Sequence, residues 1–207
     1  MESNKQFGDE IALALGHKGY YCANHFFNIE EINQLRTFAQ DLYASGKFKS
    51  AGIGKDHSFQ HHKEIRTDHI YWLDKGGLPQ DLLFFYERFD AFVSEVNRAC
   101  YLGIVDSELH LAVYPKGTFY KKHLDVFQHT TARRLSFICY LNADWKPEDG
   151  GQLRLYPQPL DEEIYLDIDP LGGRMLCFLS GEIPHEVLVS QRERWSITGW
   201  LKGPSYW

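Results

Sequence analysis

The sequence has no long apolar run and no apolar export segment at its start. No stretch approaches the roughly 20 consecutive apolar residues that a membrane-spanning helix needs, and the first residues are polar and charged. A secretory signal would require an apolar region there. We therefore expect a protein without a membrane partner that resides in the cytoplasm.

The sequence also lacks an excess of basic residues. It holds 22 Lys and Arg residues against 28 Asp and Glu residues, and its formal net charge is −6. Proteins that bind nucleic acid draw much of their affinity from Lys and Arg contacts to phosphates, which leave a basic footprint in the sequence. We therefore expect no nucleic-acid partner.

Cysteines are few and unpaired in sequence. The four residues are Cys22, Cys100, Cys139 and Cys177, and none belongs to a CxxC pair. Their number permits two disulfides, but a chain of this length buries roughly 70% of its unfolded surface and folds without cross-links. We interpret all four as buried thiols.

Two segments carry apolar residues at helical spacing. Asn28, followed three residues later by Glu31, matches a capping box, and the apolar stripe after it continues to Gly46. A second stripe begins near Pro79 and ends at Cys100. Both stripes predict helices that pack on a sheet rather than cofactor-binding segments.

The segment between these helices, residues 48–62, contains two glycines among polar residues and leads into a strand-like segment at 65–73. Such a loop is typical of a mobile flap beside a site, and equally of an ordinary hairpin connection. The sequence alone leaves both readings open.

From residue 109 the pattern changes to short strands separated by Gly and Pro turns. The strand candidates are 109–114, 118–125, 134–141, 152–156, 164–168, 174–179, 185–190 and 194–201. Such a series predicts a β-sandwich or jelly roll. We expect a mainly β protein with supporting helices, organised as one domain over 1–207, with helical support over about 1–105 and the core over about 106–203.

Three residues are candidate ligands of one metal ion: His123, Asp125 and His185. Side chains two apart on a strand project to the same face, so His123 and Asp125 can reach one ion. His185 can add a third ligand from another strand. Two histidines and one carboxylate leave coordination positions open, as in non-haem iron(II) oxygenases. An HxD triplet also arises by chance, so its surroundings matter.

Arg194 begins a strand candidate nine residues after His185. Strand alternation gives this segment one polar and one apolar row. The polar row is Arg194, Ser196, Thr198 and Trp200, and the apolar row is Trp195, Ile197, Gly199 and Leu201. A buried guanidinium needs an anion, and its planar fork fits a carboxylate. That anion is either a structural Asp or Glu or a bound ligand. Tyr140 is either a second donor to it or a core residue.

Several short motifs follow one another in a fixed order. They are Ile65-Arg66-Thr67-Asp68, Tyr114-Pro115, Tyr120, His123-Leu124-Asp125, Tyr140-Leu141-Asn142, Gly150-Gly151, Pro184-His185-Glu186-Val187 and Arg194-Trp195-Ser196. Together they resemble the 2-oxoglutarate oxygenases of the hypoxia-factor prolyl hydroxylase type and their bacterial relatives. The resemblance implies a double-stranded β-helix (jelly-roll) core. It also implies a dioxygenase that hydroxylates a prolyl residue of a protein substrate and releases succinate and CO2.

The resemblance implies site roles by position. His123, Asp125 and His185 would bind Fe(II), and Arg194 with Tyr140 would bind the distal carboxylate of 2-oxoglutarate. Other residues implied around 2-oxoglutarate are Thr198, Trp200, Ile138, Leu153 and Val187. Tyr114 and Tyr120 are implied as catalytic residues near the iron and the substrate, and Asp68 and Arg133 as a substrate-binding pair. O2 would be the second cosubstrate and ascorbate a reductant.

Three departures from the family pattern bear on the substrate. The stretch from Tyr114 to His123 is one residue shorter than in the animal enzymes, His110 stands where an apolar pocket residue is expected, and the loop before Ile65 has its own sequence. The alternatives are an oxygenase of another residue or of a small molecule, and a non-catalytic metal-binding jelly-roll module. By analogy with bacterial members, elongation factor Tu is a candidate protein substrate.

Overall fold

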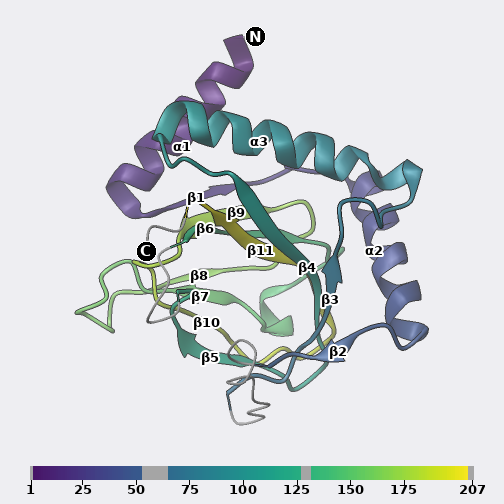
Figure 1. Ribbon diagram of the computed structural model, residues 1–207. Coiled ribbons are helices and arrows are strands. Elements are labelled where there is room, and N and C mark those ends of the chain that lie inside the picture. Colours follow the sequence, from purple (N-terminus) through teal and green to yellow (C-terminus); the bar gives the residue numbers. More distant parts are fainter. Residues whose placement is uncertain (1, 53–64, 127–131, 205–207) are drawn as a thin grey trace.

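The computed structural model describes residues 2–52, 65–126 and 132–204 as two antiparallel sheets with helices on one side (Figure 1). The larger sheet contains, in spatial order, β1 (Tyr20–Ala23), β9 (Met175–Leu179), β6 (Arg133–Tyr140), β11 (Arg194–Lys202), β4 (Asp106–Tyr114), β3 (His69–Leu73) and β2 (Lys49–Ser50). The smaller contains β5 (Tyr120–His123), β10 (His185–Val187), β7 (Leu153–Leu155) and β8 (Leu166–Ile168). The predicted mainly β class with supporting helices is confirmed.

The described helices are α1 (Glu2–Lys18), α2 (Ile29–Ala44) and α3 (Phe84–Cys100), with short 3-10 turns at Gln80–Leu82 and Pro147–Asp149. Figure 1 shows α1 and α3 crossing over the larger sheet, with α2 at its side. None of the described helices is long and apolar enough to cross a membrane.

The start of α2 follows the predicted capping box. The Asn28 side chain accepts hydrogen bonds from the backbone N–H groups of Glu30 and Glu31, and the Glu31 carboxylate accepts one from the Asn28 N–H at 2.8 Å. These bonds satisfy N–H groups that have no partner within the helix. Arg88 on α3 donates to both Glu31 oxygens, which ties the two helices together.

Several elements differ from the sequence prediction: strands β1 and β2 were not predicted, and the strands predicted at 118–125, 164–168 and 185–190 are shorter. The second helix begins at Phe84 rather than near Pro79, because residues 80–82 form a separate 3-10 turn. The strand expected at 65–73 is shorter and begins at His69. Helix α1 was not predicted, since its stripe of Phe7, Ile11 and Leu15 is narrow and sits in a polar segment. Most of the loop predicted at 48–62 lies outside the described residues.

Strands β4, β6 and β11 separate two apolar cores. On β6, Phe137 and Cys139 pack with the helices, whereas Ile138 and Tyr140 pack with residues of the smaller sheet. On β11, the apolar row that includes Trp195 packs on the helical side, as its alternation predicts. The opposite row of each strand therefore faces the space between the sheets, which is where the site lies.

The four cysteines are free thiols. Cys139 and Cys177 are fully buried, whereas Cys22 and Cys100 are half-buried. Burial raises the pKa of the Cys139 and Cys177 thiols well above its usual range. The expectation of thiols rather than disulfides is confirmed, although two of the four are less buried than predicted.

Candidate active site

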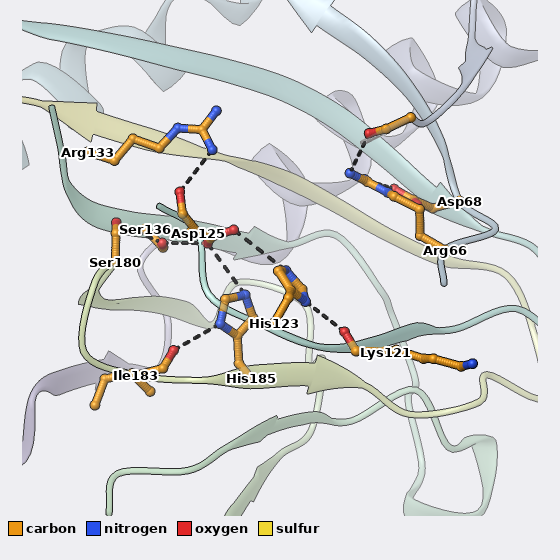
Figure 2. Close-up of polar contacts among 11 residues, drawn as sticks. Arg66, Asp68, Lys121, His123, Asp125, Arg133, Ser136, Ser180, Ile183 and His185 are labelled. Carbon is orange, nitrogen blue, oxygen red and sulfur yellow. Dashed lines mark hydrogen bonds and ion pairs between the residues drawn. The ribbon is translucent and has the colours of Figure 1, made fainter. Parts of the chain in front are cut away.

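His123, Asp125 and His185 converge between the two sheets. His123 ends β5 and His185 begins β10, and the two are direct cross-strand partners. Asp125 lies two residues beyond His123. The three side chains offer ligand atoms within 4.8 Å of one another. The Asp125 carboxylate lies 3.6 Å from His123 Nε2 and 3.4 Å from His185 Nε2. Figure 2 shows the three side chains pointing toward one another.

Backbone carbonyls fix the orientation of both imidazoles. His123 Nδ1 lies 2.7 Å from the Lys121 carbonyl oxygen, and His185 Nδ1 lies 3.1 Å from that of Ile183 (Figure 2). A carbonyl only accepts, so each Nδ1 carries the proton and each Nε2 presents a lone pair toward Asp125. Burial lowers the pKa of His185 to about 4, which keeps its ring neutral at neutral pH. Such rings are prepared to bind a metal ion.

The Asp125 carboxylate is held by a buried hydroxyl pair. Ser136 Oγ donates to Asp125 Oδ2 at 2.6 Å and lies 3.0 Å from Ser180 Oγ. Burial alone would raise the pKa of Asp125, and the Ser136 hydrogen bond counteracts this because it favours the ionised carboxylate. Strand alternation places Ser136 on the site face of β6, whereas no sequence signal identifies Ser180.

Replacement of Ser136 with alanine is expected to weaken metal binding. The change leaves Asp125 in place but removes the hydroxyl that orients it, and loss of such supporting bonds typically costs about 10- to 100-fold in metal affinity. Titration calorimetry with Mn²⁺ measures the effect. Ser94→Ala, on the exposed face of α3, is the matched control. Equal Mn²⁺ affinity in the two variants would contradict the role of Ser136.

Arg194 lies on the other side of the same interior, at the start of β11, and is only 2% exposed. Its Nε donates to the Gly151 carbonyl at 2.8 Å, and its guanidinium carbon lies 5.0 Å from the ring centroids of Tyr114 and Tyr140. Within the described parts of the chain, no Asp or Glu carboxylate forms an ion pair with it. The sequence left open whether a structural Asp or Glu or a bound ligand neutralises Arg194. Because no described carboxylate pairs with it, the structure favours an anionic ligand.

The Tyr140 hydroxyl is available to the same ligand. It is buried and has no hydrogen-bond partner among the residues described. Burial raises the pKa of Tyr140 to about 12, so its hydroxyl stays protonated and can donate. A buried donor without a partner is destabilising, which indicates that a ligand completes its hydrogen bonding.

A small inner cavity joins the metal-ligand cluster to Arg194. Its lining includes His123, Asp125, His185, Arg194, Thr198, Trp200, Ile138, Leu153, Val187, Tyr114 and Tyr120. The structure thus brings together the residues that the sequence assigned to the metal and to 2-oxoglutarate, with Tyr140 beside Arg194. A metal-binding cluster at one end and a buried cation at the other suit a ligand with carboxylates at both ends.

Tyr114 lines this inner cavity beside Arg194, whereas Tyr120 lines both this cavity and a larger one that opens beyond the metal ligands. Tyr114 is the cross-strand partner of Arg194. The Tyr120 ring stacks on the His123 ring with centroids 3.6 Å apart. The guanidinium carbon of Arg66 lies over the Tyr120 ring, 4.4 Å from its centroid. Burial raises the pKa of Tyr114 beyond its usual range and that of Tyr120 to about 12. Both phenols therefore remain neutral at physiological pH.

The predicted pairing of Asp68 with Arg133 is wrong. Asp68 accepts two hydrogen bonds from Arg66, at 2.8 and 2.7 Å. Arg133 donates to the backbone carbonyl of Asp125 at 2.9 Å and to Glu108 at 3.4 Å. Arg66 and Asp68 lie two apart on an extended segment, so their side chains share a side and meet locally. The pattern of Ile65-Arg66-Thr67-Asp68 contained this signal.

A larger outer cavity of about 750 Å³ opens beyond the metal ligands. His123 and Asp125 lie at its inner end, and Trp72, Arg66 and Arg133 contribute to its walls. Trp72 is 52% exposed, which is high for a large aromatic side chain. The lining of the cavity thus runs from the exposed Trp72 to two of the candidate metal ligands.

Comparison with known proteins places this geometry in a family. Residues 109–202 match the model of the 2OG-Fe(II) oxygenase superfamily. The crystal structure of a Pseudomonas putida prolyl-4-hydroxylase is similar with a TM-score of 0.84 and 32% identity, over 95% of this chain and 99% of that one. The chain belongs to the 2OG-Fe(II) oxygenase superfamily. The family resemblance seen in the motifs and the jelly-roll core of this oxygenase are thereby confirmed.

Two further relatives extend the comparison. The structure of a prolyl hydroxylase in complex with a hypoxia inducible factor oxygen degradation domain peptide fragment, from Trichoplax adhaerens, has a TM-score of 0.86 and 27% identity, over 97% of this oxygenase and 91% of that chain. The hypoxia-inducible factor prolyl hydroxylase of Caenorhabditis elegans is 34% identical over 97% of this chain but only 29% of its own length. The matched part of the oxygenase corresponds to well under half of the length of these curated relatives.

Proposed function

We propose that this oxygenase hydroxylates a prolyl residue in a protein or peptide, using iron(II), 2-oxoglutarate and O2 and releasing succinate and CO2. The observation that carries the proposal is the buried Arg194 facing the His123, Asp125 and His185 cluster across one cavity. The likeness to the P. putida prolyl-4-hydroxylase over nearly all of that chain supports prolyl chemistry.

The donor set fits iron(II). Two neutral imidazole nitrogens and one carboxylate form the ligand set of mononuclear iron oxygenases, and here their ligand atoms lie within 4.8 Å of one another. When bound, iron(II) supplies the redox chemistry that couples oxidative decarboxylation of 2-oxoglutarate to hydroxylation of the substrate. The protein's part is to position both reactants and to keep bulk water away.

The remaining site residues have distinct tasks in this proposal. Arg194 and the Tyr140 hydroxyl bind the distal carboxylate of 2-oxoglutarate, while Thr198 and Trp200 line its polar side. The apolar walls are Ile138, Leu153 and Val187. Tyr114 lies beside Arg194 and Tyr120 lies at the boundary with the outer cavity, and both orient the reacting groups.

The outer cavity supports a polypeptide substrate. It has a volume of about 750 Å³ and is lined by aromatic and charged side chains, and the relative from T. adhaerens holds a peptide fragment. The Arg66–Asp68 pair and Arg133 line or border this substrate region. We propose elongation factor Tu as a candidate substrate, ascorbate as a reductant, a cytoplasmic location and a single catalytic domain over residues 1–207.

The proposed reaction is tested in two steps. Purified protein with iron(II) and 2-oxoglutarate is expected to form succinate slowly without any substrate, which separates an oxygenase from a non-catalytic metal-binding module. With host proteins or purified elongation factor Tu, peptide mass spectrometry is expected to show the addition of one oxygen atom to proline. Absence of succinate refutes the oxygenase activity, whereas oxygen added to another residue type refutes the prolyl assignment.

A further inference from the structure

His110 lies between the inner and outer cavities and lines both of them. It sits on β4, where its cross-strand partners are Trp72 on β3 and Thr198 on β11. Thr198 faces the 2-oxoglutarate end of the site, and Trp72 faces the outer cavity. His110 thus occupies the wall where a bound cosubstrate and a bound polypeptide would meet.

The imidazole of His110 is buried without a hydrogen-bond partner. The residue is only 3% exposed, Nδ1 is enclosed, and none of the described residues bonds to either ring nitrogen. Burial lowers the pKa of His110 to about 4, so the ring is neutral at physiological pH. A neutral imidazole offers one donor and one acceptor, and leaving both unused in a protein interior is destabilising. Because Nδ1 is enclosed, Nε2 is the nitrogen left for a ligand.

Aromatic neighbours hold the ring in place. The His110 centroid lies 5.0 Å from that of Trp72 and 5.6 Å from that of Trp200. Arg133 stacks over Trp200, with its guanidinium carbon 3.4 Å from the ring centroid. A polar ring fixed in this way loses little conformational entropy when it binds, which favours a recognition role over a flexible surface contact.

We propose that His110 is a specificity-determining residue that accepts or donates a hydrogen bond to a polar side chain of the substrate beside the target proline. The proposal rests on the proposed prolyl hydroxylation. A purely apolar residue beside the proline would leave the imidazole unpaired and would therefore be rejected. The substrate class is accordingly a polypeptide with a hydrogen-bonding residue, such as Ser, Thr, Asn, Gln, Asp or Glu, next to the modified proline.

The test compares His110→Met, which keeps an elongated side chain but removes both hydrogen-bonding nitrogens, with His110→Gln, which retains a donor and an acceptor. A library of proline-centred peptides with randomised flanking positions is the probe, and mass spectrometry gives the residue preference at each position. Wild type and His110→Gln are expected to prefer polar residues at one flanking position. His110→Met is expected to lose that preference.

Binding and cosubstrate measurements separate recognition from a structural role. For the best wild-type peptide, fluorescence anisotropy with Mn²⁺ and 2-oxoglutarate is expected to show about tenfold weaker binding in His110→Met and a change within about twofold in His110→Gln. The melting temperature is expected to stay close to wild type, and any change in the KM for 2-oxoglutarate, from succinate formation, is expected to be smaller than the change in peptide binding.

The outcomes distinguish the two proposals. Identical peptide preferences in wild type and His110→Met overturn the role of His110 and leave prolyl hydroxylation standing. An increased KM for 2-oxoglutarate in His110→Met with unchanged peptide binding also overturns it, because His110 would then serve the cosubstrate. If wild-type enzyme that forms succinate modifies no proline in the library, the proposed function fails and the inference fails with it.

Discussion

Replacement of His123 or Asp125 with alanine is expected to abolish succinate formation from 2-oxoglutarate. Each change removes one of the three candidate ligands found among the described residues, whose donor atoms lie within 4.8 Å of one another. Two remaining ligands would bind iron(II) weakly and would no longer fix its position relative to Arg194. We expect activity to fall by at least about 1,000-fold, which corresponds to roughly 4 kcal/mol of transition-state stabilisation.

Succinate release under saturating iron(II) measures this loss, and titration with Mn²⁺ reports metal binding independently of turnover. His17→Ala, an exposed histidine at the end of α1, is the matched control. Circular dichroism shows whether each variant keeps its fold. A folded His123→Ala protein that still decarboxylates 2-oxoglutarate with iron present would show that the ligand assignment is wrong.

Replacement of Arg194 with alanine is expected to raise the KM for 2-oxoglutarate with a smaller change in kcat. The side chain is almost fully buried and forms no ion pair with a described carboxylate, so its charge is free to bind the distal carboxylate of the cosubstrate. Charged hydrogen bonds contribute about 1.5–3 kcal/mol each, which predicts an increase of about 10- to 100-fold.

A series of variants tests whether the paired N–H donors of the Arg194 guanidinium, rather than its charge alone, are needed to bind 2-oxoglutarate. Arg194→Lys retains the charge but not the paired donors, and an intermediate KM is expected. Tyr140→Phe removes one neutral donor and is expected to raise the KM by about threefold to tenfold. Arg154→Ala is the control, because Arg154 pairs with Asp167 outside the site. An unchanged KM for 2-oxoglutarate in Arg194→Ala would place the carboxylate elsewhere.

Local patterns predicted the fold and the site where local geometry decides the outcome. Alternation along β6 and β11 assigned Tyr140 and Arg194 to one interior and Trp195 to the opposite core, because side chains in a strand alternate whatever the tertiary context. The spacing of His123 and Asp125 correctly predicted that their side chains lie close together, for the same reason. Asn28 and Glu31 marked the start of α2 because the capping bonds are local.

Features that depend on contacts through space were harder to predict. The partner of Asp68 was assigned by resemblance to Arg133, but the structure gives it the nearby Arg66. Ser180 supports Asp125 through Ser136, and nothing in the sequence links these positions. His110 carried a signal only as a departure from an expected apolar residue. Its unpaired nitrogens and aromatic neighbours became visible only when β3, β4 and β11 were placed side by side.

The direct pairing of His123 with His185 has a consequence for the stability of the smaller sheet. Strand β5 lies at the edge of that sheet and holds only four residues, so it has few backbone bonds of its own. An ion bound by residues of β5 and β10 would link these two strands at the edge of the sheet. Its binding free energy would increase the stability of the native state relative to the unfolded state. The same ion that equips the enzyme for chemistry would therefore also keep its outermost short strand from fraying.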